Sequence, residues 1–339
     1  MKKIGLFLIS FIFFIIFYAE CKESKDDIVI SSKKIVIKDF PEAFNPSLLK
    51  IENGFILTFR YCLSPAYPWI SYIGIVKLDD DLNIISEAQL LKTRNDESIT
   101  PSQAEDARIF YIKNKMYLIY NDNIDIIDPK TNSRRDIFIA ELQFIEDHFV
   151  LSEPFKIIHE DNYFAVNWQK NWVPFSFQDE LLIGYSLYPH EILKTDLHSG
   201  LCTSFFNTTK KKLWKWGVLR GGTPALLVEG NYLAFFHSST NIRTKESNYN
   251  AMPHYYIGAY IFSSKPPFNI QKISPSPIIG KGFYTNSSCN KRVIFPGGFV
   301  TVKNQFYLAY GKDDSEIWIA TIDKKNLLKS LITVSKNHE

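Results

Sequence analysis

The chain has 339 residues, of which 45% are hydrophobic and 15% aromatic, a composition that can bury a large core and excludes a disordered protein. Its 39 basic and 36 acidic residues leave a net charge of +3, which is too small to indicate binding to nucleic acid or to an anionic membrane surface. The cysteines are far apart and lack the Cys-x-x-Cys or His/Cys spacing of a metal site, so we expect no metal.

The N-terminus carries the pattern of an export signal. Lys2 and Lys3 precede an apolar run over residues 4–19, which is short for a membrane span of about 20 apolar residues. Cys21 resembles a bacterial lipoprotein site, although Glu20 stands where a small residue is usual. We therefore expect an exported protein, periplasmic or anchored to a membrane only through this segment. The predicted organisation is a signal peptide or N-terminal anchor over residues 1–20, a polar tether over residues 21–35 and a single domain over residues 36–335.

The rest of the chain is typical of an all-β protein, because short aromatic and β-branched runs alternate with Asn, Asp and Gly. One plan recurs five times: a polar start, a strand, a short turn and a second strand. A hairpin followed by two further strands makes a four-stranded blade, so the repetition predicts a five-bladed β-propeller. A large sandwich of meanders is the alternative. The five units start near Asn45, Glu105, Asn171, Arg220 and Phe295.

The polar starts should meet at one end of the propeller. In a hairpin, the start of the first strand and the end of the second strand lie on the same rim, so all five units contribute to one mouth. A charged, polar funnel of this kind predicts a ligand site. We expect it to contain Asn45, Arg60, Glu105, Asp106, Arg108, Asn121, Asp122, Lys170, Asn171, His190, Arg220, Thr223, His237, Lys312, Asp313 and Asp314.

Seven motifs along residues 44–322 carry a resemblance to a known family. In chain order they are "FNPSLL…FR", "EDARI", "KNWVPF", "RGGTPAL", "YIGAY", "FPGGFV" and "YLAYGKDDSEIWIAT". Together they resemble glycoside hydrolase family 130, the five-bladed propeller family of β-mannoside phosphorylases and hydrolases, which is also similar to a group of β-1,2-mannosyltransferases. The motifs are more specific for the fold than for the reaction.

The resemblance implies roles for individual residues. The family's Glu-Asp-Pro-Arg signature appears as Glu105-Asp106-Ala107-Arg108, with Ala107 in place of proline. It implies that Asp106 is the general acid, whose proton reaches the glycosidic oxygen through a sugar hydroxyl. In phosphorolysis, basic side chains hold inorganic phosphate, and the candidates are Arg60, Lys170, Arg220 and His237. The remaining candidates for binding substrate or phosphate are Glu105, Arg108, Asn171, His190, Thr223 and Asp314.

The nucleophile separates the candidate reactions. An inverting hydrolase needs a second carboxylate, about 6.5–9.5 Å from the acid, to activate water. A phosphorylase needs cations that hold phosphate instead. Asp313 and Asp314 are candidates for the second carboxylate, and the family's Tyr-Gly-x-x-Asp ending aligns best with Asp314. The aromatic side chains that could stack on sugar rings are Trp172, Tyr188 and Tyr256.

Structural roles compete with several of these assignments. Glu105 and Arg108 could pair with each other to fix a loop, and Trp172 could belong to the core. The glycines after Arg220 could let the backbone pass close to the axis rather than bind phosphate.

We therefore expect an enzyme that cleaves β-mannosides or related glycans by inverting phosphorolysis or by hydrolysis, without a cofactor and with inorganic phosphate as the co-substrate of phosphorolysis. One alternative is a β-mannosyltransferase that uses a sugar phosphate or a nucleotide sugar. The other is a non-catalytic propeller that binds glycans.

Overall fold

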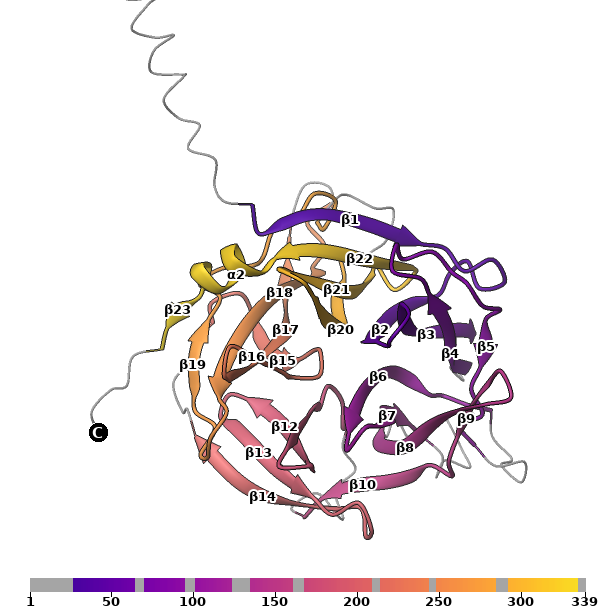
Figure 1. The fold of residues 1–339 in the computed structure, drawn as a ribbon. Helices are drawn as coiled ribbons and strands as arrows, with labels where there is room; N and C mark the ends of the chain where they lie inside the picture. Colours follow the sequence, from indigo (N-terminus) through magenta and orange to yellow (C-terminus); the bar gives the residue numbers. More distant parts are fainter. Residues whose placement is uncertain are drawn as a thin grey trace, which may run out of the picture.

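The computed structural model describes residues 27–64, 70–94, 101–123, 135–160, 168–208, 214–243, 248–284 and 292–334. The predicted export signal and Cys21 lie outside these ranges. Figure 1 shows the sheets arranged in a ring, with β2, β6 and β20 close to the centre. No helix in the described ranges is long and apolar enough to cross a membrane.

The strands of the described ranges form four hydrogen-bonded sheets. The first sheet contains β2 (Phe44–Lys50), β3 (Phe55–Ser64), β4 (Ile70–Leu78) and β5 (Gln89–Leu90). The second sheet contains β6 (Glu105–Ile112), β7 (Lys115–Asp122), β8 (Asp136–Ile145), β9 (His148–Leu151), β10 (Phe155–His159), β11 (Val173–Phe177), β12 (Glu180–Leu187), β13 (His190–Thr195) and β14 (Leu201–Thr208). It consists of two antiparallel meanders joined by a parallel pair, β10 with β14.

The third sheet contains β15 (Val218–Gly221), β16 (Leu226–Val228), β17 (Asn231–Ile242), β18 (Met252–Ser263), β19 (Ile270–Ile273) and β23 (Ile332–Thr333). The fourth sheet contains β20 (Ile294–Val302), β21 (Gln305–Lys312), β22 (Glu316–Asp323) and β1 (Val29–Ile35). The helix α2 (Lys324–Ser330) follows β22, and its N-cap Asp323 accepts a hydrogen bond from the backbone nitrogen of Asn326.

All five predicted hairpins are present: β2–β3, β6–β7, β11–β12, β16–β17 and β20–β21 pair antiparallel. Their turns fit the residues that make them. Lys113 and Asn114 both have positive φ, and so do Gln178 and Asp179. Positive φ at both central positions matches the right-handed twist of the flanking strands.

The predicted polar tether over residues 21–35 is wrong at its end, because residues 29–35 form a strand. β1 pairs along the outer edge of β22, with Ser32 opposite Ala320. Its last residue, Ile35, is buried opposite Ile317, and the two belong to the same apolar cluster. The polar residues between Val29 and Ile35 obscured this pairing, since an edge strand exposes much of its length to water.

Apolar clusters fill the spaces between neighbouring hairpins. Leu57 of β3 and Ile319 of β22 share one cluster, so the first and last hairpins are in contact. The other clusters join each hairpin to the next one along the chain. The ring is therefore closed by side-chain packing as well as by β1.

Near the axis the strand starts pack backbone against backbone. A Cβ on Gly297 would lie 2.1 Å from the carbonyl oxygen of Pro46, and one on Gly221 would lie 2.1 Å from that of Asn171. Only glycine allows such an approach. Farther along the axis, the first strands of the hairpins line a cavity of about 390 Å³ that is mostly apolar, with Leu48, Phe110, Phe175, Leu226 and Val300 in its wall.

Candidate active site

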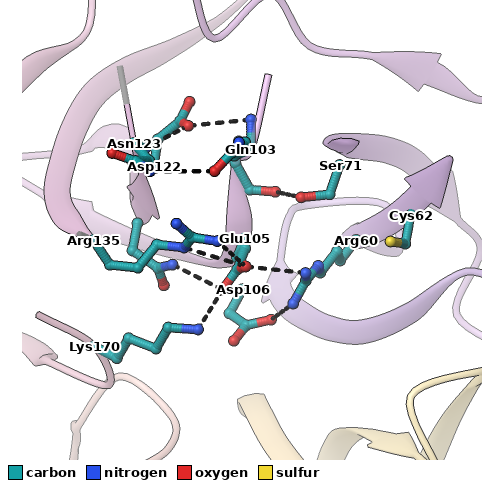
Figure 2. A network of polar contacts seen from close by, with 12 residues as sticks. Arg60, Cys62, Ser71, Gln103, Glu105, Asp106, Asp122, Asn123, Arg135 and Lys170 are labelled. Carbon is teal, nitrogen blue, oxygen red and sulfur yellow. Dashed lines mark hydrogen bonds and ion pairs between the residues drawn. The ribbon is translucent and has the colours of Figure 1, made fainter. Parts of the chain in front are cut away.

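Glu105 lies at the centre of a cluster of cations at the start of β6 (Figure 2). Its Oε1 atom accepts hydrogen bonds from Nη2 of Arg60 at 3.1 Å and from Nη2 of Arg135 at 3.3 Å. Its Oε2 atom accepts from Nδ2 of Asn121 at 3.0 Å and from the ammonium group of Lys170. The side chain is 4% exposed, so three cations surround one buried carboxylate. We call Arg60, Arg135 and Lys170 the cation array.

The array keeps Glu105 ionised. Burial alone would raise the pKa of Glu105, but Arg60, Lys170 and Arg135 outweigh burial and hold the pKa well below its ordinary value. Glu105 therefore does not take up a proton at neutral pH, and both its oxygens are already occupied by donors. Such a group is a counter-ion rather than a catalytic base.

Asp106, the next residue, is also buried and lies beside the array. Its Oδ1 atom accepts a hydrogen bond from Nδ2 of Asn45 at 2.8 Å and lies 3.6 Å from Nη1 of Arg60. Its φ is +53°, and the pairing of β6 with β7 is irregular between Glu105 and Arg108. This β-bulge lets two consecutive carboxylates reach the same group of residues.

Arg108 ties the central strands together. It is buried, and it donates to the carbonyl oxygen of Gly222 at 2.7 Å, to that of Asp106 at 2.7 Å and to Oδ1 of Asn171 at 3.2 Å. Burial lowers the pKa of its guanidinium to about 10. The alternative pairing of Arg108 with Glu105 is wrong, because the guanidinium of Arg108 donates to these three oxygens instead.

Arg60 connects the two carboxylates and a third one. Burial would lower the pKa of Arg60, but Glu105, Asp106 and Asp314 outweigh it and raise the pKa. Asp314, which follows the last hairpin, therefore interacts electrostatically with Arg60. The neighbouring Asp313 instead accepts a hydrogen bond from the backbone nitrogen of Val293 at 3.0 Å, which makes it part of the loop structure.

Two of the predicted phosphate ligands do not join the array. His237 is buried against Phe295 and Tyr255, and burial, together with repulsion from Arg108 and Arg220, lowers its pKa to about 3. It is therefore neutral at neutral pH and adds no charge to the array. Arg220 is exposed and pairs across the sheet with His237.

Two further candidates have structural positions. Thr223 is fully buried, and its hydroxyl oxygen accepts a hydrogen bond from the backbone nitrogen of Phe235. His190 is buried against the rings of Tyr260 and Phe262, and burial lowers its pKa to about 4. A histidine that follows a second strand thus lies in the core rather than at the mouth.

Sequence reasoning missed Arg135 and the indole beside it. Arg135 immediately precedes β8, the third strand of its meander, which starts on the rim where β7 ends. This position on the same rim is the sequence signal from which Arg135 could have been predicted to lie at the site. Trp168 is 50% exposed, and its ring lies 5.4 Å from the guanidinium carbon of Arg135 and 4.9 Å from Nζ of Lys170. An exposed indole held by two cations next to the site is a surface on which a sugar ring can stack.

Three other aromatic side chains were predicted to stack on sugars. Trp172 is 2% exposed and belongs to the core, as its structural alternative predicted. Tyr188 is half exposed, and Tyr256 is partly buried against Trp216.

Asp122 of the predicted mouth forms a second ion pair with Arg94, a residue that the sequence analysis did not place there, and Lys312 donates a hydrogen bond to the carbonyl oxygen of Gly282 at 2.7 Å. Arg94 donates to both carboxylate oxygens of Asp122, at 3.2 and 2.5 Å, and Asp122 is fully buried. Within the described ranges, no three acidic, histidine or cysteine side chains gather in a way that could hold a metal ion.

A buried carboxyl group beside a set of cations, at one mouth of a ring of β-sheets, provides the parts of a glycoside-cleaving enzyme. The chain belongs to glycoside hydrolase family 130: the family model described as beta-1,4-mannooligosaccharide phosphorylase matches residues 24–332. The resemblance predicted from the motifs is thereby confirmed. The comparison with curated proteins finds no match.

Solved structures with the same fold include proteins of three reaction classes. A glycosyl hydrolase from Bacteroides ovatus is 16% identical, with a TM-score of 0.60 over 89% of this chain and 93% of that one. A β-1,2-mannobiose phosphorylase from Listeria innocua is 14% identical, with a TM-score of 0.60 over 90% and 94%. A GDP-Man-dependent mannosyltransferase from Leishmania mexicana is 12% identical, with a TM-score of 0.53 over 91% and 94%. At these identities the likeness establishes the fold, so the reaction must be argued from the site.

Proposed function

We propose that this protein cleaves β-mannosides by inverting phosphorolysis, with Asp106 as the general acid and the cation array as the phosphate site. The observation that carries the proposal is that Arg60 contacts both Glu105, at 3.1 Å, and Asp106, at 3.6 Å. An anion bound to the array would therefore lie next to the acid. Arg220 and His237 are no longer part of this site, and Arg135 takes their place.

The reaction follows from these positions. Asp106 supplies the proton to the glycosidic oxygen, directly or through a sugar hydroxyl, and the bond from this oxygen to the anomeric carbon breaks. An oxygen of phosphate attacks that carbon from the opposite face, so that mannose 1-phosphate forms with inverted configuration. Arginine guanidinium groups can bind phosphate through two parallel hydrogen bonds, and the array offers two of them.

Hydrolysis is the second candidate because a third carboxylate, Asp314, interacts with Arg60 of the array. Glu105 is the counter-ion of the array and Asp313 belongs to the loop structure, and Asp314 is half-buried and interacts electrostatically with Arg60. If water is the nucleophile, Asp314 is the residue to test as the base. A mannosyltransferase reaction would use the same array to hold the phosphate groups of its donor.

We also propose that the architecture is a five-bladed propeller. The parallel pair between β10 and β14 joins two meanders, and counting these as separate blades gives five units around the axis. The cavity that is lined by all the first strands supports this count. The export pattern of residues 1–20 supports a periplasmic or membrane-anchored location, where the enzyme would meet glycans.

The test is to incubate the enzyme with β-mannobioses, with and without inorganic phosphate, and to identify the released sugar. Mannose 1-phosphate that appears only with phosphate supports phosphorolysis, and free mannose in both reactions supports hydrolysis. Arg135→Gln should abolish the phosphate-dependent release of mannose 1-phosphate, while Arg220→Gln, a matched change outside the array, should preserve it. Binding of the sugar without turnover would indicate a non-catalytic glycan-binding protein instead.

A further inference from the structure

Among the described residues, the polar contacts of the Asp106 carboxylate are made to its Oδ1 atom. Asn45 and Arg60 both approach Oδ1, at 2.8 and 3.6 Å, and no described residue donates to Oδ2. When the acid is protonated, its carbonyl oxygen is the better acceptor and its other oxygen carries the proton. The amide of Asn45 therefore selects Oδ2 as the oxygen that holds the proton.

The orientation of Asn45 is itself fixed. Its side chain is buried, and its Nδ2 faces Oδ1 of Asp106. Its Oδ1 is buried without a hydrogen-bond partner in the structure. A Cβ on Gly311 would lie 2.2 Å from this oxygen, so the last hairpin packs directly against the amide.

The backbone at Asn45 is strained in a way that the surroundings enforce. Its φ is +46°, although the following Pro46 favours an extended residue before it. The pairing of β2 with β3 is irregular between Phe44 and Ser47, and Gly297 lies against the carbonyl of Pro46. Strain of this kind persists where the fold overdetermines a residue, and it gathers at functional sites.

We propose that Asn45 is a positioning residue for the general acid, a role that rests on the proposed function of Asp106. Asn45 holds Oδ1 of Asp106 by a hydrogen bond and leaves Oδ2 as the oxygen that delivers the proton. In the reaction the Oδ2–H bond breaks, the proton passes to the glycosidic oxygen or to a relaying sugar hydroxyl, and the negative charge spreads to Oδ1. There the Asn45 amide and Arg60 stabilise it.

The test compares two substrates that differ only in their need for a proton. The sugar that leaves β-mannobiose must be protonated, whereas the phenolate that leaves 2,4-dinitrophenyl β-mannoside needs no acid. Asn45→Gly removes the amide and tolerates the left-handed backbone. It should lower kcat on β-mannobiose by about 10-fold to 100-fold, a part of the contribution of a general acid, and leave kcat on the activated substrate nearly unchanged. Asp106→Asn should show the same selectivity with a larger loss.

Asn45→Asp keeps the shape of the side chain and replaces the donor by an acceptor, so it should show the same selective loss even if Asn45→Gly folds poorly. The matched control is Asn171→Gly: Asn171 also has positive φ and lies at the start of an inner hairpin, but it contacts Arg108 instead of the acid. Its losses should be equal on the two substrates. The inference would be overturned if Asn45→Gly and Asn45→Asp each lost as much kcat on the activated substrate as on β-mannobiose. An absence of turnover by the unmodified enzyme would instead overturn the proposed function on which the inference rests.

Discussion

Replacing Glu105 by glutamine removes one charge from the centre of the site and leaves its shape almost unchanged. At an effective dielectric constant of about 20, the single contact with Arg60 at 3.1 Å corresponds to about 5 kcal/mol. Arg135 and Lys170 add two further contacts, and their repulsion toward each other and toward Arg60 offsets part of the sum. Breaking a buried ion pair costs about 3–5 kcal/mol, so Glu105→Gln should lower the free energy of unfolding by this amount at pH 7.

The pH dependence provides an independent signature of the same group. The pKa of Glu105 is lower in the folded protein than its ordinary value of 4.5, so its contribution to stability is fully present above pH 4.5 and is lost as the pH falls toward the folded value. The unmodified protein should therefore lose stability below pH 4.5 more steeply than Glu105→Gln does. Urea denaturation at several pH values measures both quantities.

Glu180→Gln is the control for this experiment, because Glu180 forms an exposed ion pair with Lys194. It should change the free energy of unfolding by at most about 0.5 kcal/mol. The reasoning would be refuted if Glu105→Gln cost less than about 1 kcal/mol, or if its stability fell with acid as steeply as that of the parent.

Three further predictions concern single side chains. Trp168→Ala should raise KM for β-mannobiose about 10-fold with little change in kcat, because a stacked ring binds the substrate and the transition state equally well. The control is Phe144→Ala, which removes an exposed ring over Lys77 and should leave the steady-state kinetics unchanged. Gly297→Ala should lower the free energy of unfolding by about 1–3 kcal/mol in a denaturant titration, because its methyl group would meet the carbonyl of Pro46; an unchanged midpoint would contradict the close packing at the axis. Burial lowers the pKa of His190 to about 4, so this histidine takes up a proton on unfolding, and the unmodified protein should lose about 1.4 kcal/mol of stability per pH unit as the pH falls from 6.5 to 4. His190→Phe should not show this loss, and parallel curves of stability against pH for the two proteins would contradict the prediction.

The hairpins could be predicted because local signals specify them. Each turn contains residues that tolerate positive φ, and each strand alternates or concentrates apolar residues within a few positions. The convergence of Arg60, Glu105 and Asp106 followed from topology, since strand starts and ends share one rim. Their positions needed no knowledge of how the sheets twist.

The sequence-based predictions failed where the position of a side chain depends on the twist of the sheets and on which segments pack against it. His190 and His237 are at the right ends of their strands, yet the rings of neighbouring sheets enclose them, and no sequence pattern reveals that packing. Arg135 lies at the start of a third strand, so the hairpin pattern does not point to it. The pairing of β1 is hidden in the sequence because its partner, β22, is at the other end of the chain.

That partner sets the order in which the protein can fold. Ser32 cannot pair until Ala320 has been synthesised, and the first and last hairpins share an apolar cluster that neither can complete alone. Bringing residues so distant in sequence together costs chain entropy before their contacts contribute any stability. Closure of the ring should therefore be slow. During synthesis, the segment that precedes the first hairpin emerges with an unpaired edge and keeps it until the last sheet has been made. The closing strand is thus the earliest part of this sheet to be made and among the last to find its place.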